Sequence, residues 1–243
     1  MIRLLLVVIF LLLFFIISII LLPVEWVIGK FSKKTKDISS LRIVQGAFKG
    51  ILFLAGTKTT VIGSENIPTD EPVLFIGNHR GFFDIVISYT YMKNPTGFVA
   101  KKEMWKALFI RRWMLNLYCL FLDRENMKEG LKTILQGIDY IKNDKSIFIF
   151  PEGTRNSGGG VQEFHGGSFK FAEKTGCKII PVIQNNTEAI LEKQFPFIKS
   201  AHTIIEFGKP IDINELPKEK RKKIASHTHD IIEAAYEKNQ ALV

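Results

Sequence analysis

The sequence predicts an α/β domain whose mostly parallel sheet is flanked by helices, with membrane helices at the N-terminus. Three observations predict this fold: a long apolar run near the N-terminus, short apolar runs beyond residue 57, and amphipathic helical segments between those short runs. The short runs are continuously apolar, as in strands of a sheet that helices cover on both faces. We therefore divide the chain into a membrane-attached segment, residues 1–56, and a globular domain, residues 57–243.

The composition excludes two broad classes of protein. With 47% hydrophobic residues and 20 phenylalanines, the chain of 243 residues has enough apolar surface to fold, so it is not intrinsically disordered. Its two cysteines, Cys119 and Cys177, are too few for a disulfide scaffold. The formal net charge of +9 favours an anionic partner, which could be phospholipid headgroups, a phosphate-bearing substrate or nucleic acid.

The N-terminal apolar run has the length of one membrane crossing. From Leu4 to Leu22 the only polar residue is Ser18. At about 1.5 Å per residue, a helix over this run spans roughly 28 Å, close to the ~30 Å hydrocarbon core of a bilayer. A cleaved signal peptide would have a shorter apolar core and a cleavage site of small residues, which this run lacks. We interpret the run as an uncleaved membrane anchor.

Positive charges after this run predict its orientation. Lys30, Lys33, Lys34 and Lys36 follow the run, whereas Arg3 is the only basic side chain before it. Basic flanks of membrane helices stay on the cytoplasmic side. We therefore expect the globular domain to lie at the cytoplasmic face of the membrane.

A second helical segment, Leu41–Ala55, is amphipathic and has a basic polar face. Arg42, Gln45 and Lys49 lie opposite the apolar side chains that recur at helical spacing. Such a helix suits either the headgroup layer of a membrane or a place against the core of its own domain. In a further arrangement, the two N-terminal segments form a helical hairpin that dips into one leaflet without crossing.

Strands and helices alternate along the rest of the chain. The predicted strands are Thr59–Ile62, Val73–Gly77, Gly97–Ala100, Tyr118–Leu122, Ser146–Phe150, Lys178–Ile183 and Thr203–Phe207. The predicted helices are Ile85–Met92, Met104–Asn116, Met127–Lys142, Gly167–Thr175 and Pro217–Lys238. This alternation is typical of an α/β domain with parallel strands.

The segment Asn78–Asp84 follows a predicted strand directly and precedes a helix. Functional groups in parallel sheets gather at such carboxyl ends of strands. Asp84 could hold one imidazole nitrogen of His79 and leave the other free to accept a proton. The alternative is that Asp84 only caps the helix and His79 is an ordinary loop residue. By spacing alone that alternative is favoured, because a histidine and an aspartate five residues apart occur often by chance.

The segment Phe150–Asn156 also follows a predicted strand. Gly153 permits an unusual turn, Thr154 offers a hydroxyl, and Arg155 offers a planar fork for phosphate. Glu152 could orient the guanidinium of Arg155. The alternative is an ordinary turn with a surface arginine.

Two further segments end or interrupt predicted strands. Arg124 is a second candidate ligand for phosphate, with Asp123 beside it to orient it; a surface ion pair is the alternative. Pro181 lies inside a strand that reads as central, where proline is unfavourable unless the backbone has an unusual shape. Such a proline suggests a shaped backbone near a site.

Taken together, these segments resemble the 1-acylglycerol-3-phosphate acyltransferases of the glycerolipid acyltransferase superfamily. Asn78–Asp84 matches the Asn-His-x4-Asp block of that family, Asp123-Arg124 its second block, Phe150–Asn156 its third and Pro181 its fourth. The resemblance covers roughly residues 58–210. The second block usually begins with glycine, and this chain has Tyr118 there.

The resemblance implies transfer of an acyl chain from a thioester donor, acyl-CoA or acyl carrier protein, to the free sn-2 hydroxyl of lysophosphatidic acid. The product would be phosphatidic acid. His79 would be the general base and Asp84 its orienting partner. The acceptor phosphate would lie in a pocket made by Arg124, Glu152, Gly153, Thr154 and Arg155, with Asn78 and Pro181 as structural residues nearby. No metal ion or other cofactor is implied.

Two alternative functions remain open at this point. One is an acyltransferase for another acceptor, such as glycerol 3-phosphate or another lysophospholipid. The other is a membrane lipid-binding protein that keeps the fold without chemistry, which the intact pair of His79 and Asp84 disfavours. We do not expect nucleic acid as a partner, because much of the basic excess lies beside the membrane segments and no recognition motif is present.

Overall fold

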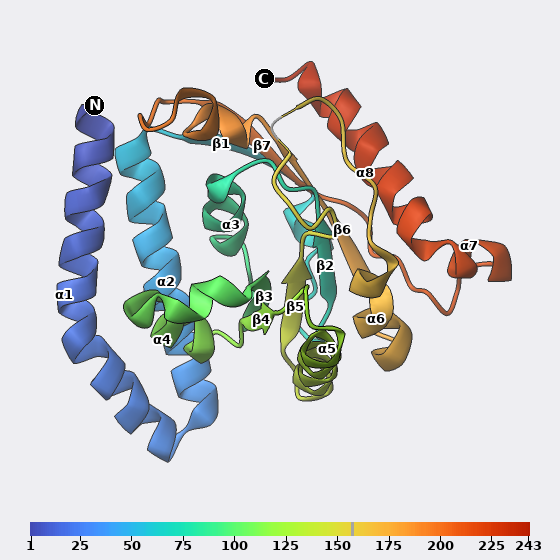
Figure 1. Cartoon of the computed structure of the whole chain (residues 1–243), viewed down its shortest axis with the longest axis horizontal. Helices are drawn as coiled ribbons and strands as arrows, with labels where there is room; N and C mark the ends of the chain where they lie inside the picture. The colour runs from blue at the N-terminus through green and yellow to red at the C-terminus, as the bar shows by residue number, and fades with distance from the viewer. Residues whose placement is uncertain (157) are drawn as a thin grey trace.

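A seven-stranded sheet lies at the centre of the molecule in a computed structural model that describes residues 1–156 and 158–243 (Figure 1). The strand order is β1-β7-β6-β2-β5-β3-β4, and neighbouring strands are parallel except for β6 and β7. The strands are β1 (Lys58–Ile62), β2 (Leu74–Gly77), β3 (Thr96–Lys101), β4 (Leu120–Leu122), β5 (Ser146–Ile149), β6 (Ile179–Asn185) and β7 (His202–Phe207). The predicted α/β class with a mostly parallel sheet is confirmed.

Helices cover both faces of the sheet (Figure 1). On one side are α1 (Ile2–Phe31), α2 (Lys33–Ala55), α3 (Phe82–Tyr89) and α4 (Leu108–Asn116), and on the other α5 (Met127–Lys142), α6 (Lys170–Thr175), α7 (Lys218–Lys222) and α8 (Ile224–Gln240). Alternate strand residues enter two separate cores: Phe75 and Phe148 face the first group of helices, and Leu74 and Ile147 the second. The strands are continuously apolar because both of their faces are buried.

Most differences between the predicted and observed helices are at their ends. The predicted helices Met104–Asn116 and Gly167–Thr175 each begin as a 3-10 helix, Lys102–Lys106 and Gly166–Phe169 respectively. The predicted C-terminal helix is divided in two at Lys223, whose backbone leaves helical geometry at ψ 33°. None of these differences changes which segments surround the sheet.

The strand predicted over Tyr118–Leu122 begins only at Leu120, because Tyr118 has a left-handed backbone with φ 61°. Its carbonyl oxygen passes so close to Gly97 that a Cβ atom there would lie 2.0 Å away. The Tyr118 hydroxyl donates a hydrogen bond of 2.7 Å to Asp37, which also pairs with Lys145 at 3.1 Å. The side chain is therefore fixed in a turn that glycine would adopt more easily.

The α2 helix packs against the core of the α/β domain. Leu41 and Ile51 belong to the same apolar cluster as the strand residue Phe75. The Gln45 amide is buried and donates to the backbone carbonyls of Tyr89, at 3.1 Å, and Met92, at 2.7 Å. The prediction that Gln45 lies on an outward polar face was therefore wrong. Of the two positions predicted for this helix, the structure shows the one against the core of its own domain.

The α1 helix runs beside α2 as the outer arm of a helical hairpin (Figure 1). It continues past the predicted run to Phe31, with Pro23 inside the helix. Its buried Ser18 accepts a hydrogen bond of 2.9 Å from the indole of Trp113, and its buried Glu25 accepts hydrogen bonds from two serines of α2. Both α1 and α2 are long and apolar enough to cross a bilayer, and most of the apolar side chains of α1 face outward.

Candidate active site

The predicted site residues gather where β2, β4, β5 and β6 end. The imidazole of His79, just after β2, stacks on the ring of Phe150, just after β5, with centroids 4.2 Å apart. Arg124, just after β4, donates a hydrogen bond to the carbonyl of Gly153. β2 pairs with β5, and β3 joins β5 to β4, all in parallel, so the carboxyl ends of β2, β5 and β4 share one edge of the sheet. The fold therefore joins three segments that are far apart in the sequence.

His79 and Asp84 form a hydrogen-bonded pair. Nδ1 of His79 lies 2.7 Å from Oδ2 of Asp84, which is completely buried, whereas the imidazole keeps 16% of its surface exposed. An ionised carboxylate can only accept, so the neutral imidazole carries its proton on Nδ1 and the lone pair on Nε2 is free. This is the arrangement that a general base requires.

Further contacts fix Asp84 itself. Its Oδ2 accepts hydrogen bonds from the backbone amides of Arg80, at 2.5 Å, and Gly81, at 2.8 Å, while Oδ1 accepts one from the hydroxyl of Thr187. The cap position of α3 is occupied by Gly81, and Asp84 is the third residue of the helix, which corrects its predicted place at the cap. From this position in the first turn, the Asp84 carboxylate accepts hydrogen bonds both from the backbone at the start of α3 and from His79.

Glu152 holds the backbone of the site. It is 5% exposed, and its carboxylate accepts hydrogen bonds from the backbone amides of His79, at 2.7 Å, and Gln162, at 3.2 Å. Burial raises the pKa of this carboxyl, and the two amides oppose the shift. The prediction that Glu152 orients Arg155 was wrong, because Glu152 binds these two amides while the ion pair of Arg155 is with Glu192.

Arg155 is oriented by Glu192 instead. Its guanidinium lies 4.1 Å over the ring of Phe82, and one nitrogen is 3.5 Å from Oε1 of Glu192. Glu192 also accepts a hydrogen bond of 2.8 Å from the amide of Phe82, and burial raises its pKa. The Glu192 carboxylate approaches Gly81 so closely that a larger residue at position 81 would displace this carboxylate. Arg155 is exposed beside the first turn of α3.

A cavity of about 310 Å³ opens beside Arg124 and Gly153. Most of its lining is apolar, with Phe150 and His165 among the residues around it. Gly153 has φ 74°, and a Cβ atom there would lie 3.3 Å from the ring of His165, so the turn favours glycine. Burial lowers the pKa of the Arg124 guanidinium. On the same turn, Thr154 is exposed.

Asn78 and Pro181 belong to the framework of the sheet. The buried amide of Asn78 exchanges two hydrogen bonds, 2.9 and 2.8 Å, with the backbone of Gln184, which ties the ends of β2 and β6 together. Pro181 lies level with Ile76 and just before the antiparallel pairing of β6 with β7 begins at Val182. Its carbonyl accepts from the amide of Gly208 at 2.8 Å. The proline therefore stands where the ladder to β7 ends.

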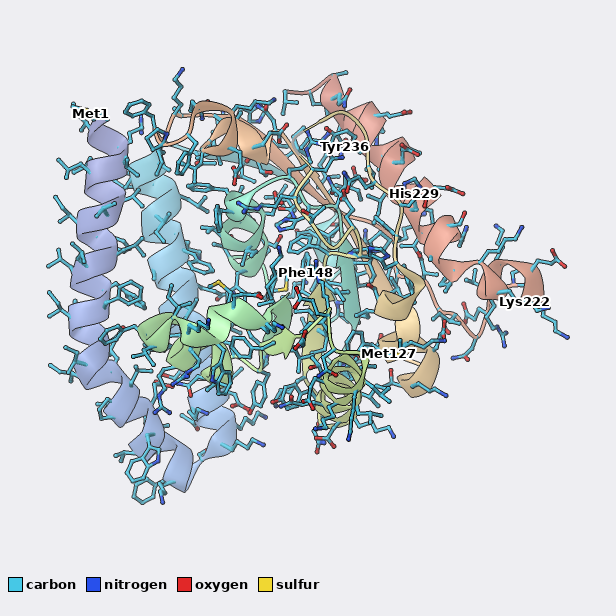
Figure 2. All side chains as sticks on the ribbon, viewed as in Figure 1. Met1, Met127, Phe148, Lys222, His229 and Tyr236 are labelled. Carbon is cyan, nitrogen blue, oxygen red and sulfur yellow. The ribbon has the colours of Figure 1, made fainter. Side chains whose placement is uncertain are left out.

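Three residues at this edge were not predicted from the sequence to belong to the site: Arg80, Thr187 and Glu188. The guanidinium of Arg80 is 2.8 Å from Glu188, and both side chains are 3% exposed. It also faces the ring of Tyr236 on α8 at 5.3 Å, which Figure 2 labels. Thr187 and Glu188 follow β6 at the same edge of the sheet, so the rule that drew attention to His79 would have found them.

Comparison with known proteins places the chain in a family. The sequence profile of the Acyltransferase family matches residues 58–185. A 1-acyl-sn-glycerol-3-phosphate acyltransferase of Haemophilus influenzae is 34% identical over 206 residues, which cover 82% of this chain and 82% of the relative. One of Borreliella burgdorferi is 32% identical over 193 residues, which cover 79% of this chain and 77% of the relative.

A solved structure shares the fold. The crystal structure of a 1-acyl-sn-glycerophosphate acyltransferase from Thermotoga maritima matches with a TM-score of 0.80, and the match covers 96% of each chain at 21% identity. The family suggested by the sequence blocks is confirmed. The chain belongs to the acyltransferase family.

Proposed function

We propose that this enzyme transfers an acyl chain from a thioester to the free sn-2 hydroxyl of lysophosphatidic acid and so makes phosphatidic acid. The observation that carries the proposal is the His79–Asp84 pair, with Nε2 free, at the edge of the sheet where Arg124 and Arg155 also lie. Relatives that are about one-third identical carry the name 1-acyl-sn-glycerol-3-phosphate acyltransferase, which supports this acceptor.

In the proposed reaction His79 acts as general base. Nε2 removes the proton of the acceptor hydroxyl while its oxygen attacks the thioester carbonyl. The new carbon–oxygen bond forms, the carbon–sulfur bond breaks, and the imidazolium returns the proton to the departing thiolate. Asp84 holds the imidazole by Nδ1 and stabilises its positive charge. No step uses a group other than the two substrates and these side chains.

The acceptor phosphate is proposed to bind between Arg124 and Arg155. Each guanidinium offers several N–H donors in a plane, a geometry that matches phosphate oxygens. Arg124 donates to the carbonyl of Gly153, and the exposed hydroxyl of Thr154, the next residue, is proposed to be a further donor to the phosphate. Glu152 contributes indirectly by fixing the backbone of His79. The apolar cavity beside Arg124 has the chemistry to receive an acyl chain.

The outer face of α1 is proposed to lie in the membrane, with the α/β domain on the cytoplasmic side. Apolar side chains cover this face, and those of α4 continue it, with Phe15 and Phe109 in contact at 6.0 Å between ring centroids. Such a surface would bring the site to a substrate that is itself a membrane lipid.

A matrix of acceptors and donors tests the proposal. Purified full-length enzyme is given lysophosphatidic acid, glycerol 3-phosphate or lysophosphatidylcholine, each with acyl-CoA or acyl carrier protein thioester, and the products are identified by mass spectrometry. We expect phosphatidic acid from lysophosphatidic acid as the dominant product with at least one donor. Faster acylation of either other acceptor would overturn the proposed substrate, and the same matrix identifies the donor.

A further inference from the structure

A second hollow, separate from the one beside Gly153, lies at the turn of the N-terminal hairpin. It has a volume of about 550 Å³ and shares no lining residue with the first cavity. Three helices contribute basic side chains to it: Lys30 from α1, Lys33 and Lys36 from α2, and Arg112 from α4. Leu22 and Trp26 form part of its apolar wall.

The positive charges of this hollow have no negative partner among residues 1–156 and 158–243. None of its four basic side chains forms an ion pair there, and no acidic side chain lines the hollow. The two nearby acids face inward: Asp37 pairs with Lys145, and Glu25 accepts hydrogen bonds from Ser39 and Ser40. Like charges repel one another unless an anion neutralises them.

Local contacts hold two of these lysines at the hollow. Nζ of Lys30 lies 4.6 Å over the indole ring of Trp26. The stem of the half-buried Lys36 crosses α1 at Gly29, where a Cβ atom would lie 2.9 Å from Cδ of the lysine. A larger residue at position 29 would push this stem away, so the small side chain of Gly29 permits the convergence of charge.

We propose that this hollow binds the headgroup of an anionic phospholipid. The four cations would surround the phosphate, and the acyl chains would lie along the exposed apolar faces of α1 and α4. Trp26 stands at the boundary between the charged and apolar parts, a place that suits an indole ring. The inference rests on the proposed contact of α1 with the membrane, but not on the proposed reaction.

The test measures binding of dihexanoyl phosphatidylglycerol to the full-length chain in neutral detergent. The signal is the fluorescence of Trp26, obtained as the difference between the chain and its Trp26→Phe variant. We expect a saturable change, and much weaker binding of dihexanoyl phosphatidylcholine, which has no net charge, and of inorganic phosphate, which has no chains. Lipid binding should persist in His79→Ala, which lacks the proposed general base. A failure of the lipid-binding proposal can therefore be distinguished from a failure of the proposed reaction.

Matched charge variants locate the site. Each basic residue near a lipid surface contributes about fivefold to the binding affinity. The double variant Lys33→Gln with Arg112→Gln should therefore lower the affinity for the lipid by about 30-fold. The control, Lys218→Gln with Lys220→Gln, makes the same change of charge in α7, which lies at the far end of the molecule (Figure 1). Lys30→Gln serves as a second, independent site variant, and thermal unfolding checks that each protein is folded.

Three results would overturn the proposal. An equal loss in the α7 control would mean that the lipid responds to net charge and not to this hollow. Inorganic phosphate binding as tightly as the lipid would mean a free-anion site. A signal that does not saturate, or that phosphatidylcholine reproduces, would mean ordinary mixing with detergent.

Discussion

Asp84 has four hydrogen-bond donors around a carboxylate that water does not reach. Two are backbone amides of its own turn, one is Nδ1 of His79 and one is the hydroxyl of Thr187. Donors stabilise the ionised form of a carboxylate. Three of the four donors lie within five residues of Asp84, but Thr187 is 103 residues away and is brought there by β6.

Thr187 is therefore expected to position the catalytic pair. Replacing it with valine keeps the shape of the side chain but removes its donor to Asp84. A hydrogen bond to a charged group contributes about 1.5–3 kcal/mol, so we expect kcat to fall by roughly 10- to 100-fold with little change in KM. Steady-state kinetics measures both constants. Thr187→Ser retains the hydroxyl and should recover most of kcat; an equal loss in Thr187→Ser would count against this role.

Arg155 and Arg124 give a second residue-scale prediction, which concerns the acceptor. Each alanine variant should lower kcat/KM for lysophosphatidic acid by about 10- to 100-fold through the loss of a charged hydrogen bond. Lysine should restore activity only in part, because it lacks the planar fork. The comparison is with a monoacylglycerol acceptor, which carries no phosphate. If both acceptors lose activity equally, neither arginine binds the phosphate.

The segment after β6 is the element that connects the site to the rest of the domain. The 3-10 helix Thr187–Ala189 supplies both the donor to Asp84 and the carboxylate that pairs with Arg80. Burial would raise the pKa of Glu188, but the hydrogen bond and charge of Arg80 outweigh it and lower that pKa. Burial would likewise lower the pKa of Arg80, and Glu188 raises it. The ionised carboxylate of Glu188 thus holds Arg80, the residue next to His79, in place.

Glu188→Gln should destabilise the fold, because Arg80 would remain buried without its ionised partner. Removing one member of a buried ion pair costs about 3–5 kcal/mol, which urea unfolding near neutral pH would measure. The pKa of Glu188 is lower in the folded chain than the ordinary 4.5, so its ionised form favours folding above that value. This advantage is lost as pH falls through the lowered pKa, and the gap between wild type and variant should close in acid.

The exposed partner of Glu188 provides the control for this prediction. Lys193 lies 3.2 Å from the same oxygen but is 51% exposed. Solvent screens such a pair, so Lys193→Gln should change the unfolding free energy by less than about 1 kcal/mol. A gap between wild type and Glu188→Gln that is independent of pH would show that the loss comes from packing and not from ionisation.

Several elements could be placed from sequence because their signals are local. The strand cores are apolar runs, and Asn126 accepts hydrogen bonds from Lys128 and Glu129 as the cap of α5. The left-handed backbone of Tyr118 has no such signal, since its cause is the approach to Gly97 and the bond to Asp37. Partners from distant segments, such as Glu192 for Arg155, likewise cannot be predicted from the residues around each of them.

At the scale of the whole molecule, the N-terminal hairpin belongs to both the domain and the proposed membrane surface. The α2 helix contributes several buried residues to the domain core, whereas α1 contributes Val7, covers α2 and exposes an apolar face. The apolar run of α1 could be recognised from sequence, because length and hydropathy are local properties. The packing of α2 could not, because a basic amphipathic helix suits either environment.

Deleting residues 1–22 should leave a folded but less firmly attached enzyme. The deletion removes Ser18 and so the acceptor of the Trp113 indole, but it leaves the contacts of α2 with the core. We expect the truncated chain to favour a short-chain, water-dispersed acceptor over a vesicle-embedded one, relative to the full chain. The ratio of the two rates, with vesicle co-sedimentation, measures this. An unchanged ratio would mean that α1 does not hold the enzyme at the membrane, and complete unfolding would mean that α1 is part of the core.

The central claim is that the imidazole of His79 removes the proton of the acceptor hydroxyl. The most direct test is the initial rate of phosphatidic acid formation by full-length His79→Ala, compared with wild type at saturating lysophosphatidic acid and thioester. A positioned base contributes about 10²- to 10⁴-fold, so we expect the rate to fall by that factor while the thermal unfolding midpoint stays close to that of wild type. A folded His79→Ala enzyme that forms phosphatidic acid at nearly the wild-type rate would contradict the claim.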